Sequence, residues 1–402
     1  MCSPGSRRLM RIAFLTPEFI TDKPQEGGLG NYLNRMSRLL VEAGHEVEMI
    51  VSSQLEPRVV MHGGVRVERV PNARSLPVRA VFRALRPLGL DIPLSFIRRA
   101  RSLSRALERR HRAAPFDLVQ SADYLAVGLT VQRKPGRVHV VRCSCAMDLY
   151  NAVDGKMSRF ARWQERLERA AIRNGEVAYA PSRLVAEHFR RKYRMDVSVI
   201  RPPISLEVDA EEEPPAALPD RFLLHFGQLI ERKGTFWLAE ALAIAFEMEP
   251  DLRLVMAGTA EEGVRERIFS YLGGHRSKVL ILGALRKPQL YSVLSHADAA
   301  VLPSLVDNLP NTVIESLMFG IPVIGTRGAS IDELVEEGVT GELITAGDRE
   351  ALARAMVRVW RGESQARKGF VWQGGIADEM QPARAIENLL NLAADPNEAA
   401  LR

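Results

Sequence analysis

The sequence predicts an α/β protein built from two doubly wound domains that face a central cleft. Two observations support this prediction. Short apolar runs alternate with segments whose apolar residues recur at the spacing of one helix face, and an acidic, proline-rich stretch divides these units into two series. Strands that alternate with helices imply parallel sheets covered on both faces. A length of 402 residues also exceeds what one ordinary core holds, so two domains are expected.

The first series begins with Arg11–Thr16, an apolar run that suits a buried strand. A loop that ends at Gly30 follows. From Leu29 onwards, apolar residues recur at helix spacing until Gly44, which suits a helix end because glycine readily adopts the left-handed conformation. The second strand is expected at Glu46–Val51. Further strands are expected at Phe116–Gln120, Val138–Arg142 and Glu176–Ala180, with a proline-interrupted helical pattern from Arg74 to Arg112.

Residues 205–220 are acidic and proline-rich, which predicts an exposed connector. The connector separates an N-terminal domain, residues 1–204, from a C-terminal domain, residues 221–365, and residues 366–402 are expected to form a last segment that crosses back to the N-terminal domain. Strands of the C-terminal domain are expected at Phe222–Phe226, Leu252–Ala257, Val279–Leu282, Ala299–Leu302 and Pro322–Gly325. Helices are expected at Thr235–Met248, Glu261–Leu272, Pro288–Ser295, Pro310–Phe319, Ile331–Glu336 and Arg349–Trp360.

The composition is that of a folded globular protein, with 46% hydrophobic and 26% charged residues. The longest run without a charged residue, Ser316–Thr326, is far shorter than the ~18 residues that cross a bilayer. The first apolar stretch meets acidic residues too soon for a signal peptide. The three cysteines cannot form a disulfide framework, and the further ligands of a zinc site do not accompany them. The chain is therefore expected in the cytoplasm.

The charge is divided unequally along the chain. Residues 1–205 carry a formal charge of +17 and the remainder carries −11, which gives the net charge of +6. The basic half suits docking on anionic lipid, or attraction of an acidic or phosphate-linked acceptor. Nucleic acid is not expected, because no binding motif or aromatic stacking pattern accompanies the charge. A solvated face without a binding role is the remaining interpretation.

Residues 303–326 place one carboxylate, Asp307, in a loop and a second, Glu315, inside the helix that follows. Pro310 suits the first turn of that helix, because its missing N–H would have no partner there. The helix N-terminus then forms an anion site beside Asp307. Because Glu315 lies among apolar residues, it is expected to meet a hydroxyl group or a cation. This set suits a ligand with phosphates and many hydroxyls, such as a nucleotide sugar.

Two further loops could bind an anion. Gly28 and Gly30 follow the first strand, where glycines allow backbone N–H groups to approach an anion closely. They do not complete a dinucleotide fingerprint, because Leu33 stands where the third glycine belongs. A glycine turn with a purely structural role is the alternative interpretation. After the first strand of the C-terminal domain, Lys233 could offer its charge to a diphosphate, or it could be an ordinary surface lysine.

Together these motifs resemble the family 4 glycosyltransferases, which retain the anomeric configuration and have the GT-B fold of two Rossmann-like domains. The acid-x7-acid motif of the family corresponds to Asp307 and Glu315, and Gly320-Ile-Pro-Val323 continues it. Its Gly-Arg-Leu and Lys-Gly elements correspond to Gly227-Gln228-Leu229 and Lys233-Gly234. The resemblance covers nearly the whole chain and is strongest from Phe222 to Gly341.

The resemblance implies a role for each matching residue. Lys233, Asp307 and Glu315 would be catalytic: Lys233 would neutralise the leaving diphosphate, Asp307 would face the donor sugar, and Glu315 would hold the ribose hydroxyls. The first domain would bind the acceptor, a glycan, lipid-linked sugar or small glycoside. No cofactor or metal is expected beyond a UDP- or GDP-sugar donor, and polysaccharide biosynthesis is a typical setting. The implied donor-binding residues are Gly28, Gly30, Gly227, Gln228, Asn308, Leu309, Asn311 and Thr312, and the acceptor-side candidates are Arg142 and Ser144.

Three positions depart from the family pattern. Gln228 stands where arginine is usual, Asp307 replaces the commoner glutamate, and Ser144 stands where many relatives have histidine. An inactive relative, or a non-catalytic module that binds glycans or membranes, is therefore one alternative. A sugar-nucleotide epimerase or a phosphorylase with a similar two-domain cleft is another. A nicotinamide-dependent reductase is disfavoured by the broken glycine fingerprint.

Overall fold

The structure is a computed structural model that describes residues 8–22, 28–71, 76–155, 158–204, 212–214 and 218–394. The chain divides into two compact units. Unit 1 contains Met1–Pro203 and Glu379–Arg402, and unit 2 contains Ile204–Asp378. Most of the predicted connector, residues 205–211 and 215–217, lies outside the described residues.

Unit 1 is organised around an eight-stranded sheet with the order β3-β4-β2-β1-β5-β6-β7-β8. All neighbouring strands are parallel except β3 and β4, which are antiparallel. All six residues of the central strand β1 are buried, as the continuous apolar run predicts. The strands are β1 (Arg11–Thr16), β2 (Glu46–Ser53), β3 (Val59–His62), β4 (Val65–Pro71), β5 (Leu118–Ala122), β6 (Val138–Arg142), β7 (Val177–Ala180) and β8 (Ser198–Val199).

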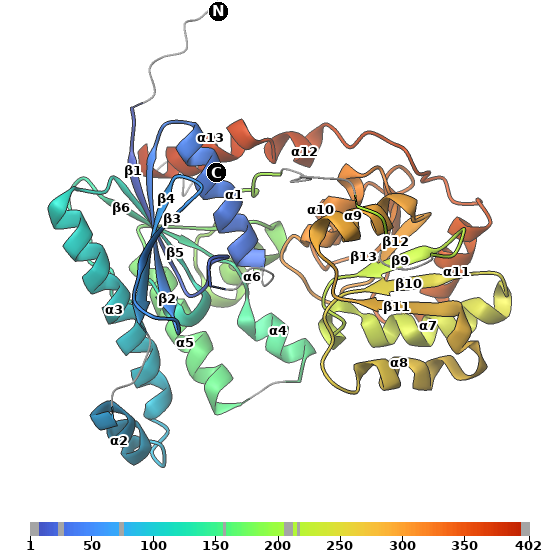
Figure 1. The fold of residues 1–402 in the computed structure, drawn as a ribbon, viewed down its shortest axis with the longest axis horizontal. Coiled ribbons are helices and arrows are strands. Elements are labelled where there is room, and N and C mark those ends of the chain that lie inside the picture. The colour runs from blue at the N-terminus through green and yellow to red at the C-terminus, as the bar shows by residue number, and fades with distance from the viewer. Residues whose placement is uncertain are drawn as a thin grey trace, which may run out of the picture. The chain divides into compact units, whose positions relative to one another are not determined.

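Helices cover both faces of this sheet. Figure 1 shows α3 and α5 against one face and α1 and α13 against the other, so the chain returns to unit 1 through its last helix. Gly44 ends the first helix with φ +92°, the conformation for which glycine was expected there. The helices are α1 (Gly28–Glu42), α2 (Leu76–Leu85), α3 (Asp91–Ala113), η1 (Tyr124–Ala126), α4 (Met147–Val153), α5 (Arg159–Asn174), α6 (Arg183–Tyr193) and α13 (Pro382–Ala394).

Unit 2 contains a six-stranded sheet with the order β11-β10-β9-β12-β13-β14. Every pair in it is parallel, and the order reverses between β9 and β12. In open sheets of this kind, ligands bind beyond the carboxyl ends of the strands at such a reversal. The strands are β9 (Leu223–Phe226), β10 (Leu254–Ala257), β11 (Val279–Gly283), β12 (Ala299–Leu302), β13 (Val323–Thr326) and β14 (Gly341–Ile344).

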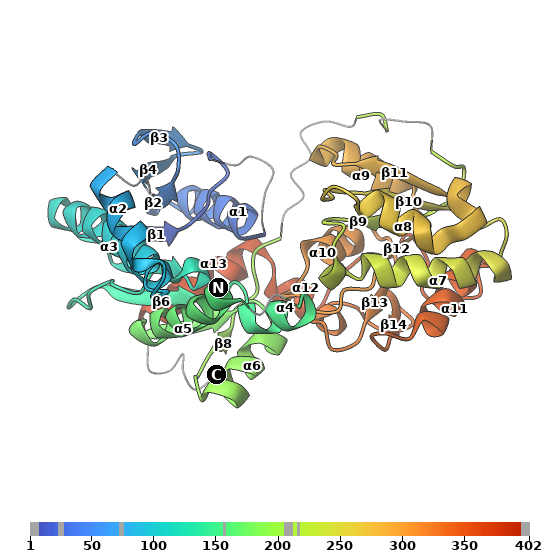
Figure 2. The same ribbon diagram turned by 90° about the horizontal axis from the view of Figure 1, so that it is seen from below.

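The helices of unit 2 also lie on both faces of their sheet. In Figure 2, α7 and α8 run along one face while α9 and α10 lie on the other. The side chains that α7 and α11 bury, such as Leu238, Leu242 and Met356, belong to one hydrophobic core with strands β9 and β10. The helices are η2 (Glu231–Lys233), α7 (Thr235–Met248), α8 (Val264–Leu272), η3 (Gly273–Lys278), α9 (Lys287–His296), α10 (Asn311–Met318), η4 (Ile331–Glu333), α11 (Arg349–Trp360) and α12 (Gly375–Glu379).

The structure confirms the predicted fold class, two Rossmann-like units with parallel sheets. It corrects three local expectations. The helix expected at Ile331–Glu336 is only one short turn, η4, and Pro310 precedes α10 instead of lying in its first turn. The loop expected to reach Gly30 ends earlier, because α1 begins at Gly28. None of the described helices is long and apolar enough to cross a membrane.

Candidate functional site

The site in unit 2 begins where β9 ends. Gly227 has φ +120°, and a Cβ atom on it would lie 3.2 Å from Cγ2 of Thr312 in the first turn of α10. A Cβ atom on Gly258, which follows β10, would lie 1.6 Å from the carbonyl oxygen of Gly227. Real Cβ atoms do not approach an oxygen so closely, so Gly258 is required for this packing, whereas Gly227 is favoured by its positive φ, which side chains rarely adopt. The carboxyl ends of β9 and β10 therefore meet the N-terminus of α10 closely.

Lys233 is held in position by the short helix η2 and by Gly234. Gly234 adopts the left-handed conformation with φ +74°, and a Cβ atom there would lie 2.0 Å from the carbonyl oxygen of Pro303. The loop after β12 is tied to the same turn, because the N–H of Leu305 donates to the carbonyl of Arg232 at 2.8 Å. These contacts bring Lys233 to the loop that carries Asp307.

Lys233 and Asp307 form an ion pair, in which Nζ donates to Oδ2. Their side chains are only 19% and 14% exposed. The hydroxyl group of Ser304 also donates to Oδ2 of Asp307 at 3.3 Å, and the N–H of Asn308 donates to Oδ1 at 3.0 Å. Asp307 therefore accepts hydrogen bonds on both oxygens, and it fixes the ammonium group of Lys233 beside the α10 N-terminus. The sequence could not show this pair, whose members lie far apart in the chain.

The segment before α10 has a backbone that favours anion binding. Leu309 has φ +58°, a conformation that non-glycine residues adopt at a cost. It is held there because its N–H donates to Oγ of Ser330 at 2.8 Å, and that hydroxyl donates to the carbonyl of Asp307 at 3.2 Å. Pro310 has ψ 125° and accepts from the N–H groups of the first turn with its carbonyl. The N–H groups of Asn311 and Thr312 have no acceptor within the helix, which makes them available to an anion.

Glu315 lies one turn into α10 and is 13% exposed. Its Oε1 accepts from the hydroxyl group of Tyr291 at 3.3 Å, and Nζ of Lys287 lies 3.6 Å from the same oxygen. The expectation that a hydroxyl group or a cation would accompany this carboxylate is confirmed. Both partners come from α9, so Glu315 and Asp307 are held by different elements. Lys287 and Tyr291 were not singled out from the sequence, because nothing in their local pattern distinguishes them from other helix residues.

Gln228 is exposed at the start of the same loop, and a cation lies beside it. The guanidinium of Arg232 donates to Oε1 of Gln228 at 3.1 Å. Position 228 has glutamine where the family usually has arginine, but the arginine four residues later lies beside it. Arg232 was not identified from the sequence, although its place directly before Lys233 was a usable signal.

A buried histidine links the elements behind the site. Nδ1 of His225 lies 2.8 Å from the carbonyl oxygen of Val301, and Nε2 lies 3.1 Å from Oγ1 of Thr235. Burial lowers the pKa of His225 to about 4, so the ring is neutral near pH 7. In its neutral form Nδ1 carries the proton that it donates to Val301. His225 thereby ties β9 to β12 and to the start of α7.

In unit 1, Arg142 and Ser144 follow one another at the carboxyl end of β6. Nη1 of Arg142 donates to Oγ of Ser144 at 2.8 Å, and the guanidinium lies 4.0 Å from the ring centroid of Tyr32. The N–H of Ser144 donates to Oδ1 of Asp123 at 2.8 Å. The structure thus brings both acceptor-side candidates together and adds Asp123, which sequence reasoning missed. Its place directly after strand β5, at the same edge of the sheet as Arg142, was a usable signal.

Asp123 belongs to a buried acidic pair. Burial raises its pKa to about 7, partly opposed by hydrogen bonds from the N–H groups of Ser144 and Tyr124. Burial also raises the pKa of Glu168, whose Oε1 accepts from Gln164 Nε2 at 2.7 Å and from the N–H of Leu125 at 2.9 Å. The negative charge of each carboxylate disfavours ionisation of the other. Oδ2 of Asp123 is buried and makes no hydrogen bond, so this edge holds an acceptor group without a partner among the described residues.

Gly28 and Gly30 open α1 and have no left-handed backbone, because neither is among the glycines with positive φ. A Cβ atom on Gly30 would make only an ordinary contact, 3.8 Å from Ile20 Cγ2. Any contact of these residues with an anion would therefore use the free N–H groups of a helix N-terminus, not a glycine turn.

Comparisons with known proteins agree with this geometry. Residues 220–361 match the family model "Glycosyl transferases group 1", and residues 27–203 match "Glycosyl transferase 4-like domain". The chain belongs to the family 4 glycosyltransferases. It is therefore a glycosyltransferase, and the two family models cover both units that the fold contains.

Relatives of this glycosyltransferase include two mannosyltransferases. The chain is 24% identical to MMP α-(1→4)-mannosyltransferase of Mycolicibacterium hassiacum over 89% of this chain and 91% of that protein. It is 25% identical to phosphatidyl-myo-inositol mannosyltransferase of Mycobacterium leprae, over 45% of this chain and 50% of that protein. Sucrose-phosphate synthase from Thermosynechococcus elongatus has a similar GT-B fold, with a TM-score of 0.70, 20% identity, and coverage of 98% and 96%.

Proposed function

We propose that this glycosyltransferase moves a sugar from a nucleoside-diphosphate donor to a hydroxyl group with retention of the anomeric configuration. The observation that carries the proposal is the ion pair of Lys233 with Asp307 at the N-terminus of α10, with Glu315 one turn further on. This places a cation, free N–H groups and two carboxylates around one helix end. A cation and N–H groups suit phosphates, and carboxylates suit sugar hydroxyls.

Each residue has a distinct role in the proposed reaction. Lys233 and the N–H groups of Asn311 and Thr312 bind the diphosphate, and they stabilise the charge that develops on it as it departs. Asp307 accepts hydrogen bonds from hydroxyls of the donor sugar, and Glu315 accepts from the ribose hydroxyls in place of Tyr291 and Lys287. The remaining positions complete the proposed donor site: Asn308 and Leu309 contact the sugar, and Gly227 lets the chain approach the diphosphate.

In this scheme each bond that breaks is matched by a bond that forms, and no metal ion takes part. The bond from the anomeric carbon to the diphosphate oxygen breaks, and the electron pair leaves with the diphosphate. The acceptor hydroxyl then attacks the same face of the sugar, and its proton passes to the departing diphosphate oxygen. Arg232, beside Gln228, supplies a second cation near the departing group, because position 228 itself is uncharged.

The acceptor side of the proposal uses unit 1. Ser144 is partly exposed at the carboxyl edge of the sheet, and the buried side chains of Arg142 and Asp123 hydrogen bond to it, so this edge offers a positioned hydroxyl group to a polyhydroxylated acceptor. Gly28 and Gly30 open α1 at the same edge, and in this proposal they remain donor-binding residues through the N–H groups of that helix N-terminus. The excess positive charge of residues 1–205 favours an acceptor attached to phosphate, at the inner membrane face. The name of the phosphatidyl-myo-inositol mannosyltransferase is in keeping with such an acceptor.

A thermal-shift panel of nucleotide sugars tests the donor. A ligand present at 100 times its Kd stabilises the native state by about 2.7 kcal/mol, and for a domain of this size that raises Tm by roughly 5–10 °C. The panel contains UDP-glucose, UDP-galactose and GDP-mannose, and a sugar that raises Tm is then assayed for release of its nucleoside diphosphate with an acceptor. Lys233→Ala is the control, in which the shift should shrink. If none of the donors raises Tm, the proposed donor site is wrong.

A further inference from the structure

One end of unit 1 exposes several apolar side chains within an arginine-rich region. Leu88 is 67% exposed, Val81 51%, Phe160 46% and Leu90 44%. Arg83, Arg86, Arg159 and Arg162 are exposed beside them in the sequence. We call these eight residues the α2–α5 tip. It comprises the end of α2, the turn that follows and the start of α5, and α2 forms the end of unit 1 in Figure 1.

Packing holds the parts of the tip next to each other. The turn after α2 is closed by the N–H groups of Leu88 and Leu90, which donate to the carbonyl of Leu85 at 3.2 and 3.3 Å. Gly89 in this turn has φ +67°, and a Cβ atom on it would lie 3.1 Å from Nη2 of Arg159. The ring of Phe160 packs on Phe96 of α3, with 5.6 Å between ring centroids. The exposed leucines and the start of α5 therefore belong to one ordered surface.

The charge around α2 and the turn after it is almost entirely positive. Residues 76–107 contain seven arginines and one acidic residue, Asp91. The nearest acidic residues on either side are already engaged by other cations. Glu68 pairs with Arg66 and Arg109, while Glu108 pairs with Lys134 and Arg137. Asp154 and Glu165 flank the arginines at the start of α5 in the sequence, so the net positive charge that an external anion could neutralise comes mainly from Arg83 and Arg86.

This combination of side chains selects one kind of partner. Arginine binds phosphate through a planar fork of donors, and a cluster of arginines is attracted to an anionic lipid surface. The water-exposed parts of leucine and phenylalanine side chains gain free energy when they enter the boundary between headgroups and acyl chains. A purely ionic partner would use the arginines and leave the apolar side chains in water.

We infer that the α2–α5 tip docks on an anionic lipid bilayer, with Leu88, Leu90 and Phe160 entering the interface and the flanking arginines binding headgroup phosphates. The inference extends the proposed position at the inner membrane face by naming the surface that makes the contact. It does not depend on the donor site, because the tip and the Lys233–Asp307 pair belong to different units.

Co-sedimentation of the full chain with vesicles tests the inference. One vesicle contains phosphatidylcholine alone, and the other contains equal amounts of phosphatidylcholine and phosphatidylglycerol. The wild-type protein should sediment with the anionic vesicle at low salt and much less with the neutral one. Arg83→Glu/Arg86→Glu should lower the partition coefficient by at least about tenfold, because each reversal replaces an attraction by a repulsion. Leu88→Ser/Leu90→Ser should lower it by on the order of tenfold, through lost apolar burial.

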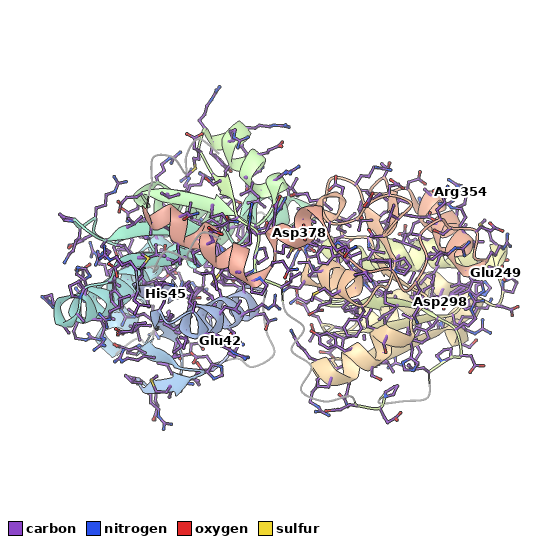
Figure 3. The ribbon with its side chains drawn as sticks, turned by 90° about the horizontal axis from the view of Figure 1, so that it is seen from above. Glu42, His45, Glu249, Asp298, Arg354 and Asp378 are labelled. Carbon is purple, nitrogen blue, oxygen red and sulfur yellow. The ribbon has the colours of Figure 1, made fainter. Side chains whose placement is uncertain are left out.

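Matched controls separate the tip from net charge and from general hydrophobicity. Arg190→Glu/Arg354→Glu makes the same change of charge at exposed sites on α6 and α11, and Figure 3 labels Arg354. Met61→Ser/Val371→Ser removes side chains that are 67% and 77% exposed elsewhere. Both controls should change the partition coefficient less than about twofold. Equal losses in controls and tip variants, or a wild-type protein that ignores anionic vesicles, would overturn the inference.

Failure of the donor site would look different. Lys233→Ala should still sediment with anionic vesicles, and the tip variants should still show the Tm increase with a nucleotide sugar. If the protein sediments with anionic vesicles but binds no nucleotide sugar, the membrane inference is supported and the proposed donor site is refuted.

Discussion

Replacing Lys233 by alanine should damage catalysis far more than stability. Lys233 and Asp307 are both mostly buried, so the substitution breaks a charge-assisted bond worth about 1.5–3 kcal/mol. The loss of stability should fall at the lower end of this range, because Asp307 keeps its hydrogen bonds from Ser304 and from the N–H of Asn308. Removing one preorganised group that stabilises developing charge costs about 2.7–4 kcal/mol in the transition state, or 10²–10³ in kcat.

These two magnitudes can be separated experimentally. A protein with a typical stability of about 5–15 kcal/mol that loses about 2 kcal/mol remains folded at 25 °C, so unfolding cannot explain a fall of a hundredfold in kcat. The assay measures release of nucleoside diphosphate under saturating donor and acceptor, and urea unfolding of the same sample measures stability. Kinetics should therefore show the large effect and unfolding the small one.

Two variants serve as controls for Lys233→Ala. Lys233→Arg keeps a cation and should retain more activity than the alanine variant. Glu231 lies in the same short helix as Lys233, and Glu231→Gln breaks only its exposed ion pair with Arg267 of α8. This variant removes no charge from the site and should leave kcat within about threefold. If Lys233→Ala lowers stability but keeps kcat within threefold of wild type, the lysine only holds the Asp307 loop and the reasoning is refuted.

Three further predictions address the donor carboxylate, the glycine contact and the buried acidic pair. Glu315→Gln should raise KM for the donor by about tenfold with little change in kcat, because ribose contacts act equally on ground and transition states; an unchanged KM with a lower kcat would contradict this role. Gly258→Ala should lower the free energy of unfolding by more than about 3 kcal/mol, because its Cβ atom would overlap the Gly227 carbonyl, whereas Gly274→Ala, with no neighbour within 4 Å, should change it by less than about 1 kcal/mol in urea unfolding. Burial raises the pKa of Asp123 from 3.8 to about 7, so only the folded state holds this proton between these values, and the free energy of unfolding should fall as pH rises from about 4 to about 7, by at most about 4 kcal/mol. Asp123→Asn can still accept from Ser144 and should flatten that slope; an equally steep slope in the variant would assign the effect to other groups, such as Glu168.

Much of the fold was predictable because strands and helices are recorded in local patterns. The mainly apolar runs of β1, β9 and β12 can be recognised without their partners, since a strand buried on both faces consists largely of apolar residues. The edge strands β3, β8 and β14 were missed because they lack such runs, whereas the edge strand β11 was predicted at Val279–Leu282. Only half of the residues of β3 are even partly buried, and β14 has four residues and pairs on one side only, so neither forms a distinctive run.

The sequence by itself determined the strand–helix alternation, the motif spacing around Asp307 and Glu315, and the family to which they belong. These depend on residues close together in the chain. Only the tertiary structure decided that Lys233 pairs with Asp307, that Arg232 lies beside Gln228, and that Asp123 is buried next to Glu168. Pairing and burial depend on which strand ends and loops meet in space, and those distances are set by the packing of whole sheets and helices, which no local pattern contains.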